Sequence, residues 1–163
     1  MKIIGIDPGL SGAIAVLDNN KVLNIFDMPV MSEGKKNKRQ LNSALLVNLL
    51  KENIISNEEV AVIVEQVNAM PGQGVTSMFN FGQTFGAIKG ICAALELPIF
   101  FVRPSKWKKH FELINSSKDS SRTKAIEMYP KLSKQLSKKK DVNKSDAILI
   151  ARFYSETRLI EEN

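Results

Sequence analysis

The sequence predicts a mixed α/β domain, in which helices flank one five-stranded sheet. Three strand-like segments follow one another near the start, separated by short turns only. Two further apolar segments, 60–64 and 99–102, alternate with long helical patterns. The expected sheet therefore has three antiparallel strands followed by parallel ones. Its 163 residues suit a single domain spanning 1–163.

The first three strands are expected to form an antiparallel meander. Residues 2–7 read as a strand that Pro8 and Gly9 end, and 12–17 read as the second strand. The turn 18–21 contains residues that tolerate positive φ, and it leads into the third strand, 22–26.

The middle of the chain alternates loop, helix and strand. Residues 31–39 are polar and predict a mobile loop. One helical face then carries leucines at Leu41, Leu45, Leu46, Leu49 and Leu50. The continuous apolar run 60–64 is typical of a strand buried on both faces. A long core helix is expected over 76–96, with apolar positions at Phe81, Phe85, Ile88, Cys92 and Leu95.

After the strand 99–102, the pattern predicts mostly helix. Short helices are expected near 104–111 and 120–128, the second ended by Pro130. A basic segment covers 134–140, and the last helix is expected over 144–160.

Composition restricts the class of function. The net charge of +6 and the pI near 9.4 make nucleic acid or an anionic membrane a plausible partner. No apolar stretch approaches the roughly 20 residues needed to span a bilayer, and a strand starting at Lys2 leaves no room for a targeting peptide. Cys92 is the only cysteine, so a reducing, cytoplasmic setting is expected. The glycines at 9–12 do not form a Walker A motif, and no nucleotide cofactor is expected.

Three acids stand at the junctions of apolar and polar sequence. Asp7 and Glu65 end apolar strands, and Asp146 opens an apolar helical run. Such carboxylates are costly to desolvate unless something compensates them. Acids that converge from separate elements are suited to a hard divalent cation bound through oxygen.

Each acid also has a purely structural explanation. Asp7 is suited to capping a hairpin turn, and Glu65 to an ion pair with a lysine or arginine. Asp146 is suited to the first turn of a helix that Asn143 caps. Taken together, the three acids favour function over these separate explanations.

Other reactive groups fit a site less well. His110 is the only histidine and is expected on a helix surface, and no nucleophile-elbow sequence accompanies it. Cys92 falls on an apolar helix face and is expected in the core. Basic residues around the acids are expected to contact the phosphate backbone of DNA; they are Lys35, Lys36, Lys38, Arg39, Lys106, Lys108, Lys109, Lys118, Arg122, Lys138, Lys139, Lys140 and Lys144.

Three motifs together resemble a known family. The segment 4–15 (Ile-Gly-Ile-Asp-Pro-Gly-Leu-Ser-Gly-Ala-Ile-Ala) is similar to the opening of RuvC-type Holliday junction resolvases. Val64-Glu65-Gln66 resembles their second motif, and 144–151 resembles their last. The segments 107–111, 118–122 and 138–141 look closer to the phage and chloroplast branch.

The resemblance implies an RNase H-like fold, a homodimer and Mg²⁺-dependent cleavage of four-way DNA junctions, with Mn²⁺ as an alternative ion. It also implies that Asp7, Glu65 and Asp146 bind the metal. The family's fourth ligand position is Asn143 here, so Asn143 itself or Asp141 is a candidate replacement. The aromatic wedge that bacterial enzymes carry after the Glu-Gln pair is absent, and the helical pattern of Phe79 and Phe81 favours the core.

The hypothesis is therefore phosphodiester hydrolysis with two divalent ions about 3.5–4 Å apart in each site. Lys118 or Lys144 is a candidate to neutralise charge in the transition state. Three alternatives stay open: another RNase H-like nuclease that acts on RNA–DNA hybrids or branched DNA, a transferase domain of the actin and sugar-kinase type, and a junction-binding module without catalysis.

Overall fold

A five-stranded sheet forms the centre of the computed structural model, which describes residues 1–34, 38–54 and 58–161. Its strand order is β3-β2-β1-β6-β7. The antiparallel part contains β1 (Lys2–Asp7), β2 (Ala13–Asp18) and β3 (Lys21–Asp27). The strands β6 (Val60–Glu65) and β7 (Ile99–Val102) then add in parallel to β1. The predicted mixed sheet is confirmed.

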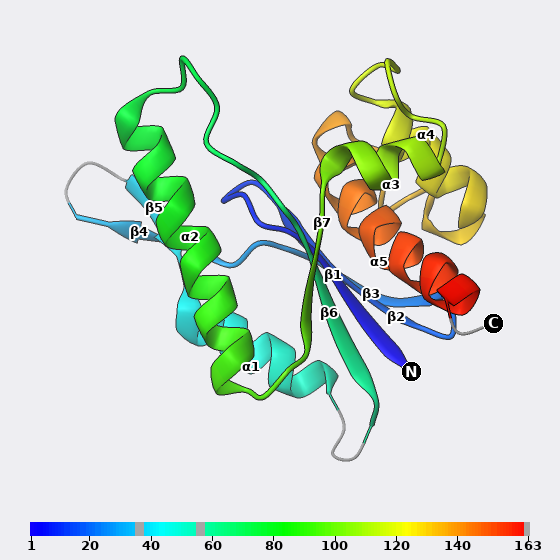
Figure 1. Ribbon diagram of the computed structural model, residues 1–163, viewed down its shortest axis with the longest axis horizontal. Helices are drawn as coiled ribbons and strands as arrows, with labels where there is room; N and C mark the ends of the chain where they lie inside the picture. The colour runs from blue at the N-terminus through cyan, green and yellow to red at the C-terminus, as the bar shows by residue number, and fades with distance from the viewer. Residues whose placement is uncertain (35–37, 55–57, 162–163) are drawn as a thin grey trace.

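Helices cover both faces of this sheet (Figure 1). One face carries α1 (Ser43–Asn53) and α2 (Val75–Ala94), and the other carries α3 (Pro104–His110), α4 (Ser120–Met128) and α5 (Val142–Glu161). The central strands β1 and β6 are apolar at consecutive positions because each of their faces packs into a separate core.

Helix α5 lies unusually close to the sheet. Gly5 on β1 makes this possible, because a Cβ atom there would lie 2.2 Å from the carbonyl oxygen of Ala147 and 2.8 Å from Cβ of Ala151. Gly5 is thus required by the contact between strand and helix and not by a turn. The small side chains of Ala147 and Ala151 complete the close packing.

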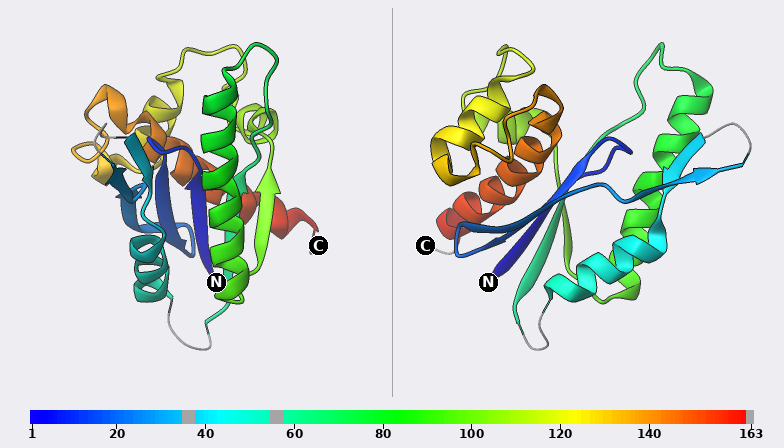
Figure 2. Two further views of the ribbon diagram at one scale, coloured as in Figure 1. Left: turned by 90° about the vertical axis from the view of Figure 1, so that its left-hand side faces the viewer. Right: turned by 180° about the vertical axis from the view of Figure 1, so that it is seen from behind.

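The predicted loop at 31–39 is wrong in part. A separate two-stranded hairpin, β4 (Val30–Glu33) and β5 (Lys38–Leu41), occupies most of it, and Figure 2 shows this hairpin beside α2. Lys35 and Lys36 fall outside the described residues. Leu41 belongs to β5 rather than to the following helix, because Asn42 caps α1 with its side-chain oxygen 3.0 Å from the Leu45 nitrogen.

The last helix also begins earlier than the expected position 144. Two short 3₁₀ turns, η1 (Pro130–Leu132) and η2 (Lys139–Asp141), precede it, and α5 starts directly after the second at Val142. Asp141 supports this early start by accepting a hydrogen bond of 2.9 Å from the Lys138 nitrogen. No helix in the described part of the chain is long and apolar enough to cross a membrane.

Helix α2 is less buried than its periodicity predicts. Thr84, Ile88 and Cys92 are its buried residues. Phe81 stacks on Phe85 with ring centroids 6.5 Å apart, but Phe79 is 65% exposed. The expectation that Phe79 is a core residue is therefore wrong.

Candidate active site

The register of the central strands brings Asp7 and Glu65 to the same edge of the sheet. Ile6 on β1 pairs with Val64 on the parallel strand β6, so Asp7 and Glu65 are the next residues on neighbouring strands. Side chains alternate along a strand, and two such residues share one face. This is also the face of Ile3 and Ile63, which pack in the core beneath α5.

Helix α5 brings Asp146 to these two acids. The close contact at Gly5 places the backbone of Ala147 directly over β1, two residues before Asp7. Asp146 precedes Ala147 and lies near enough to act electrostatically on Asp7. Three carboxylates from the first strand, a middle strand and the last helix thus converge.

Burial raises the pKa of all three carboxyl groups, and repulsion between the acids adds to this effect at Asp7 and Asp146. Burial raises the pKa of Asp7 to about 7, together with repulsion from Glu65 and Asp146. Burial likewise raises the pKa of Asp146 to about 6, with Glu65 adding to the effect. The pKa of Glu65 is raised by burial as well. A bound cation would therefore displace a proton that Asp7 retains near neutral pH.

Asp7 contributes little to the hairpin turn that it is suited to cap. The Gly9 nitrogen lies 3.5 Å from Oδ1 of Asp7, which is the outer limit of a hydrogen bond. The hairpin turn itself is closed by backbone, with the Gly12 nitrogen 2.8 Å from the Gly9 oxygen. The hairpin turn therefore does not account for the Asp7 carboxylate, which interacts mainly with the other two acids.

Asp146 is not in the first turn of α5, because that helix begins four residues earlier at Val142. Its Oδ1 atom is buried and has no hydrogen-bond partner among the described residues. The Ser121 hydroxyl lies close enough to favour the charged carboxylate, but neither atom completes a hydrogen bond. A buried carboxylate oxygen without a partner is a costly feature that a bound cation would compensate.

Glu65 is held by an indole and not by an ion pair. Nε1 of Trp107 donates to Oε1 of Glu65 at 2.9 Å. Within the described residues, no lysine or arginine lies within ion-pair distance of Glu65. Sequence reasoning missed Trp107, although α3 begins two residues after β7 ends at the same sheet edge.

Lysines favour the charged forms of the acids. Lys108, which follows Trp107 on α3, lowers the pKa of Asp7, Glu65 and Asp146. Lys118 has the same effect on Asp146. The acidic cluster is therefore bordered by cations, although burial outweighs them in each case.

Both candidates for a fourth ligand make hydrogen bonds, Asp141 through its carboxylate and Asn143 through its amide nitrogen rather than through the oxygen that could bind a metal. The Asp141 carboxylate accepts from the Lys138 nitrogen and lies 3.2 Å from Nζ of Lys144. Nδ2 of Asn143 donates to the backbone oxygen of Ser11 at 2.6 Å, which ties α5 to the turn after Asp7.

The other basic candidates differ in what their side chains contact. Lys118, Lys139 and Lys140 line an open hollow of about 400 Å³ beside Asn143. Arg39 on the hairpin donates to Oγ of Ser11 at 3.1 Å. Arg122 binds both oxygens of Asp119 and the carbonyl of Leu136. The side chains of Lys38, Lys106, Lys109 and Lys138 are exposed.

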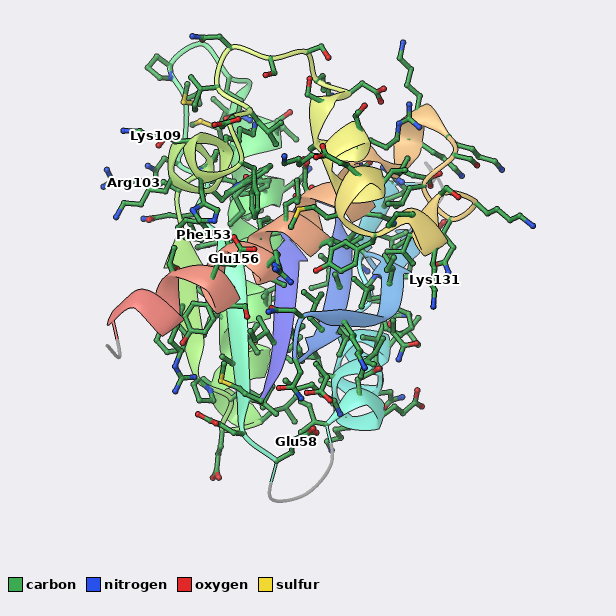
Figure 3. The ribbon with its side chains drawn as sticks, turned by 90° about the vertical axis from the view of Figure 1, so that its right-hand side faces the viewer. Glu58, Arg103, Lys109, Lys131, Phe153 and Glu156 are labelled. Atoms are coloured by element: carbon green, nitrogen blue, oxygen red, sulfur yellow. The ribbon has the colours of Figure 1, made fainter. Side chains whose placement is uncertain are left out.

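His110 and Cys92 lie outside the acidic cluster. Nε2 of His110 lies 2.6 Å from Oε2 of Glu156, which connects the end of α3 to α5. Figure 3 shows Glu156 and Phe153 on α5, with Arg103 and Lys109 at the same side of the molecule. Cys92 is buried in the core, and burial raises its thiol pKa to about 11.

The donor set fits a hard cation. Carboxylate oxygens are the ligands that Mg²⁺ and Mn²⁺ prefer, and the unpartnered oxygen of Asp146 and the raised pKa values are what a cation would relieve. Among the residues described, no three acidic, histidine or cysteine side chains are already in ligating positions. Binding of one cation by all three acids would therefore require their carboxylates to move closer together.

Comparison with known proteins identifies the fold. No protein-family profile and no curated protein sequence matches the chain. A solved structure of Thermus thermophilus RuvC in complex with a Holliday junction substrate is similar, with a TM-score of 0.62 at 16% identity over 99% of this chain and 96% of that one. A second structure of Thermus thermophilus RuvC has a TM-score of 0.56 at 19% identity over 97% of each chain. The chain therefore has the RuvC-type, RNase H-like fold.

Proposed function

We propose that this protein is a metal-dependent endonuclease that cuts four-way DNA junctions. The observation that carries the proposal is the cluster of Asp7, Glu65 and Asp146, three partly buried acids that repel one another and lack a compensating ion pair among the described residues. Lys108 and Lys118 act electrostatically on these acids, in a chain of net charge +6. Acids that require a cation, set within a surface that attracts a polyanion, favour phosphodiester hydrolysis.

In this proposal, Asp7, Glu65 and Asp146 hold Mg²⁺. The bound cation would supply a hydroxide nucleophile near neutral pH by lowering the pKa of its water. Lys108 offsets negative charge at the acids, and the hollow lined by Lys118, Lys139 and Lys140 receives a phosphate of the DNA backbone. Because the segments 107–111 and 118–122 resemble those of the phage and chloroplast branch of resolvases, we propose that the chain is nearer to that branch.

Nicking of a labelled four-way junction tests the proposal. Asp7→Asn and Glu65→Gln are expected to abolish nicking while junction binding persists, and EDTA is expected to stop the unmodified protein. Glu127→Gln is the matched control, because its side chain is 68% exposed on α4, away from the cluster. Nicking that survives in EDTA or in Asp7→Asn would refute the proposal.

Substrate preference is tested with the same protein on a linear duplex and an RNA–DNA hybrid. The proposed function requires the junction to be cut faster than either. Faster cleavage of the hybrid would assign the site to another RNase H-like nuclease, and binding without cleavage would make the chain a junction-binding module.

We further propose that the protein acts as a homodimer that associates through α2. This helix of 20 residues has a single charged residue, Lys89, yet much of its surface is exposed. One exposed stripe carries Val75 and Phe79 at one end and Gly82, Gly86 and Gly90 at the other, with open space above each glycine. Two copies in antiparallel contact would place the large side chains of one helix over the glycines of its partner.

A further inference from the structure

Trp107 combines complete burial with a polar contact to the active-site cluster. Its side chain is 0% exposed and is the largest fully buried side chain of the described residues. A buried indole N–H requires an acceptor. Here that acceptor is Oε1 of Glu65, 2.9 Å away on the neighbouring strand β6.

The group that accepts the hydrogen bond from Trp107 indicates a role beyond packing. A structural tryptophan is satisfied by any backbone carbonyl, whereas this one uses a carboxylate whose ionised form is already disfavoured by burial. An indole ring turns about two bonds only, and this fully buried ring belongs to the same core cluster as Ile63, Val102 and Ile148. The donor is therefore fixed in direction, and it restricts the rotation of the Glu65 carboxylate.

We propose that Trp107 is a positioning residue for the metal site. Its N–H holds Oε1 of Glu65, which leaves Oε2 to face the cation. This inference rests on the proposed function, since it assumes that Glu65 is a metal ligand. Partners that orient a ligand in this way commonly change metal affinity about 10- to 100-fold when they are removed.

The test removes the N–H while it preserves the shape of the side chain. Because Trp107 is the only tryptophan, growth on β-(3-benzothienyl)alanine replaces this one ring with an isostere that carries sulfur in place of N–H. Trp107→Phe removes the donor genetically. Mn²⁺ affinity is measured by calorimetry on the whole protein without DNA, so the readout does not depend on cleavage.

Both replacements are expected to weaken Mn²⁺ binding by about tenfold or more. With Mg²⁺, they are expected to lower kcat for junction nicking while KM stays unchanged. Phe111→Leu is the matched control, because Phe111 is buried in the same core next to α3 and makes no hydrogen bond to an acid through its side chain. It is expected to lower the melting temperature and to leave Mn²⁺ affinity intact.

The outcomes separate this inference from the proposed function. If the unmodified protein binds Mn²⁺ and the isosteric replacement binds it equally well, Trp107 is a core residue only and the inference is overturned. If the unmodified protein binds no Mn²⁺, the metal site itself is refuted and the inference is refuted with it. If Trp107→Phe fails to fold, the isosteric replacement still decides between these results.

Discussion

At the scale of single residues, Asp7 shows how the acidic cluster lowers the stability of the folded protein when no metal is bound. Its pKa is about 7 in the folded chain, against 3.8 for the free side chain. A group whose pKa is raised on folding binds more protons in the folded state, so stability is lost as pH rises from about 4 through about 7. Ionised Asp7 therefore destabilises the metal-free folded protein near neutral pH, where a nuclease would work.

Replacing Asp7 relieves this destabilisation. Asp7→Asn is expected to raise the free energy of unfolding by about 1–3 kcal/mol at pH 8 without metal, and to change it little at pH 4. Chemical denaturation at both pH values measures the difference. Saturating Mg²⁺ should reverse the order at pH 8, because only the unmodified site gains from binding the ion. An equal effect at both pH values would contradict the pKa argument.

Gly5 is the second residue on which the site depends. An added Cβ would lie 2.2 Å from a backbone oxygen of α5, and neither the strand nor the helix can move without disturbing the core. Gly5→Ala is expected to reduce the free energy of unfolding by about 3 kcal/mol. In Gly74→Ala the nearest atom would be 3.9 Å away, so this control is expected to change stability by less than about 1 kcal/mol.

At the scale of elements, α2 gives a direct test of association. Gly86→Leu is expected to convert a dimer to a monomer in sedimentation analysis, because the added side chain fills the space that the partner helix would occupy. Ser77→Leu is the control, since at 100° per residue it lies on the opposite side of the helix and should leave the dimer intact. A monomeric unmodified protein would refute the proposed interface.

The elements also show which parts of the fold the sequence could predict. The apolar runs at 2–7 and 60–64 predict buried strands because a strand covered on both faces needs apolar residues throughout. The β4–β5 hairpin was missed because its residues are mostly polar, and it lies outside the central sheet. Helical periodicity predicted α2, but periodicity alone cannot show what covers each face, and Phe79 was assigned wrongly to the core.

The candidate site, like the fold, could be predicted only in part from the sequence. Positions at the ends of strands predicted that Asp7 and Glu65 would lie near each other, and the strand register places them on adjacent strands. The contact between Trp107 and Glu65 was not predictable, because a tryptophan within a helix is most simply read as core. The hydrogen bonds of Asp141 to Lys138 and of Asn143 to Ser11 were likewise not predicted, and the second joins residues that are far apart in the sequence.

At the scale of the whole molecule, the charge of +6 predicts salt-dependent DNA binding. Changing Lys118, Lys139 and Lys140 together to alanine is expected to reduce the slope of log affinity against log salt by about 2–3, or roughly 0.9 for each phosphate that is no longer neutralised. Titrations from low to moderate salt measure this slope.

Arg122 serves as the control for the lysine variant, because it is basic but already bound within the protein. Its guanidinium already binds Asp119 and Leu136, so Arg122→Gln is expected to lower the melting temperature and to leave the salt slope unchanged. A lysine triple variant with the unmodified slope would remove the hollow beside Asn143 from the DNA-binding surface.

The origin of the three carboxylates in the chain has a consequence for synthesis. Asp7 belongs to the first strand and Asp146 to the last helix, with Glu65 between them. A ribosome-bound chain that has not yet produced α5 lacks one member of the triad and also the helix that closes over Gly5. The proposed active site is therefore complete only after α5 has been synthesised and has docked against β1.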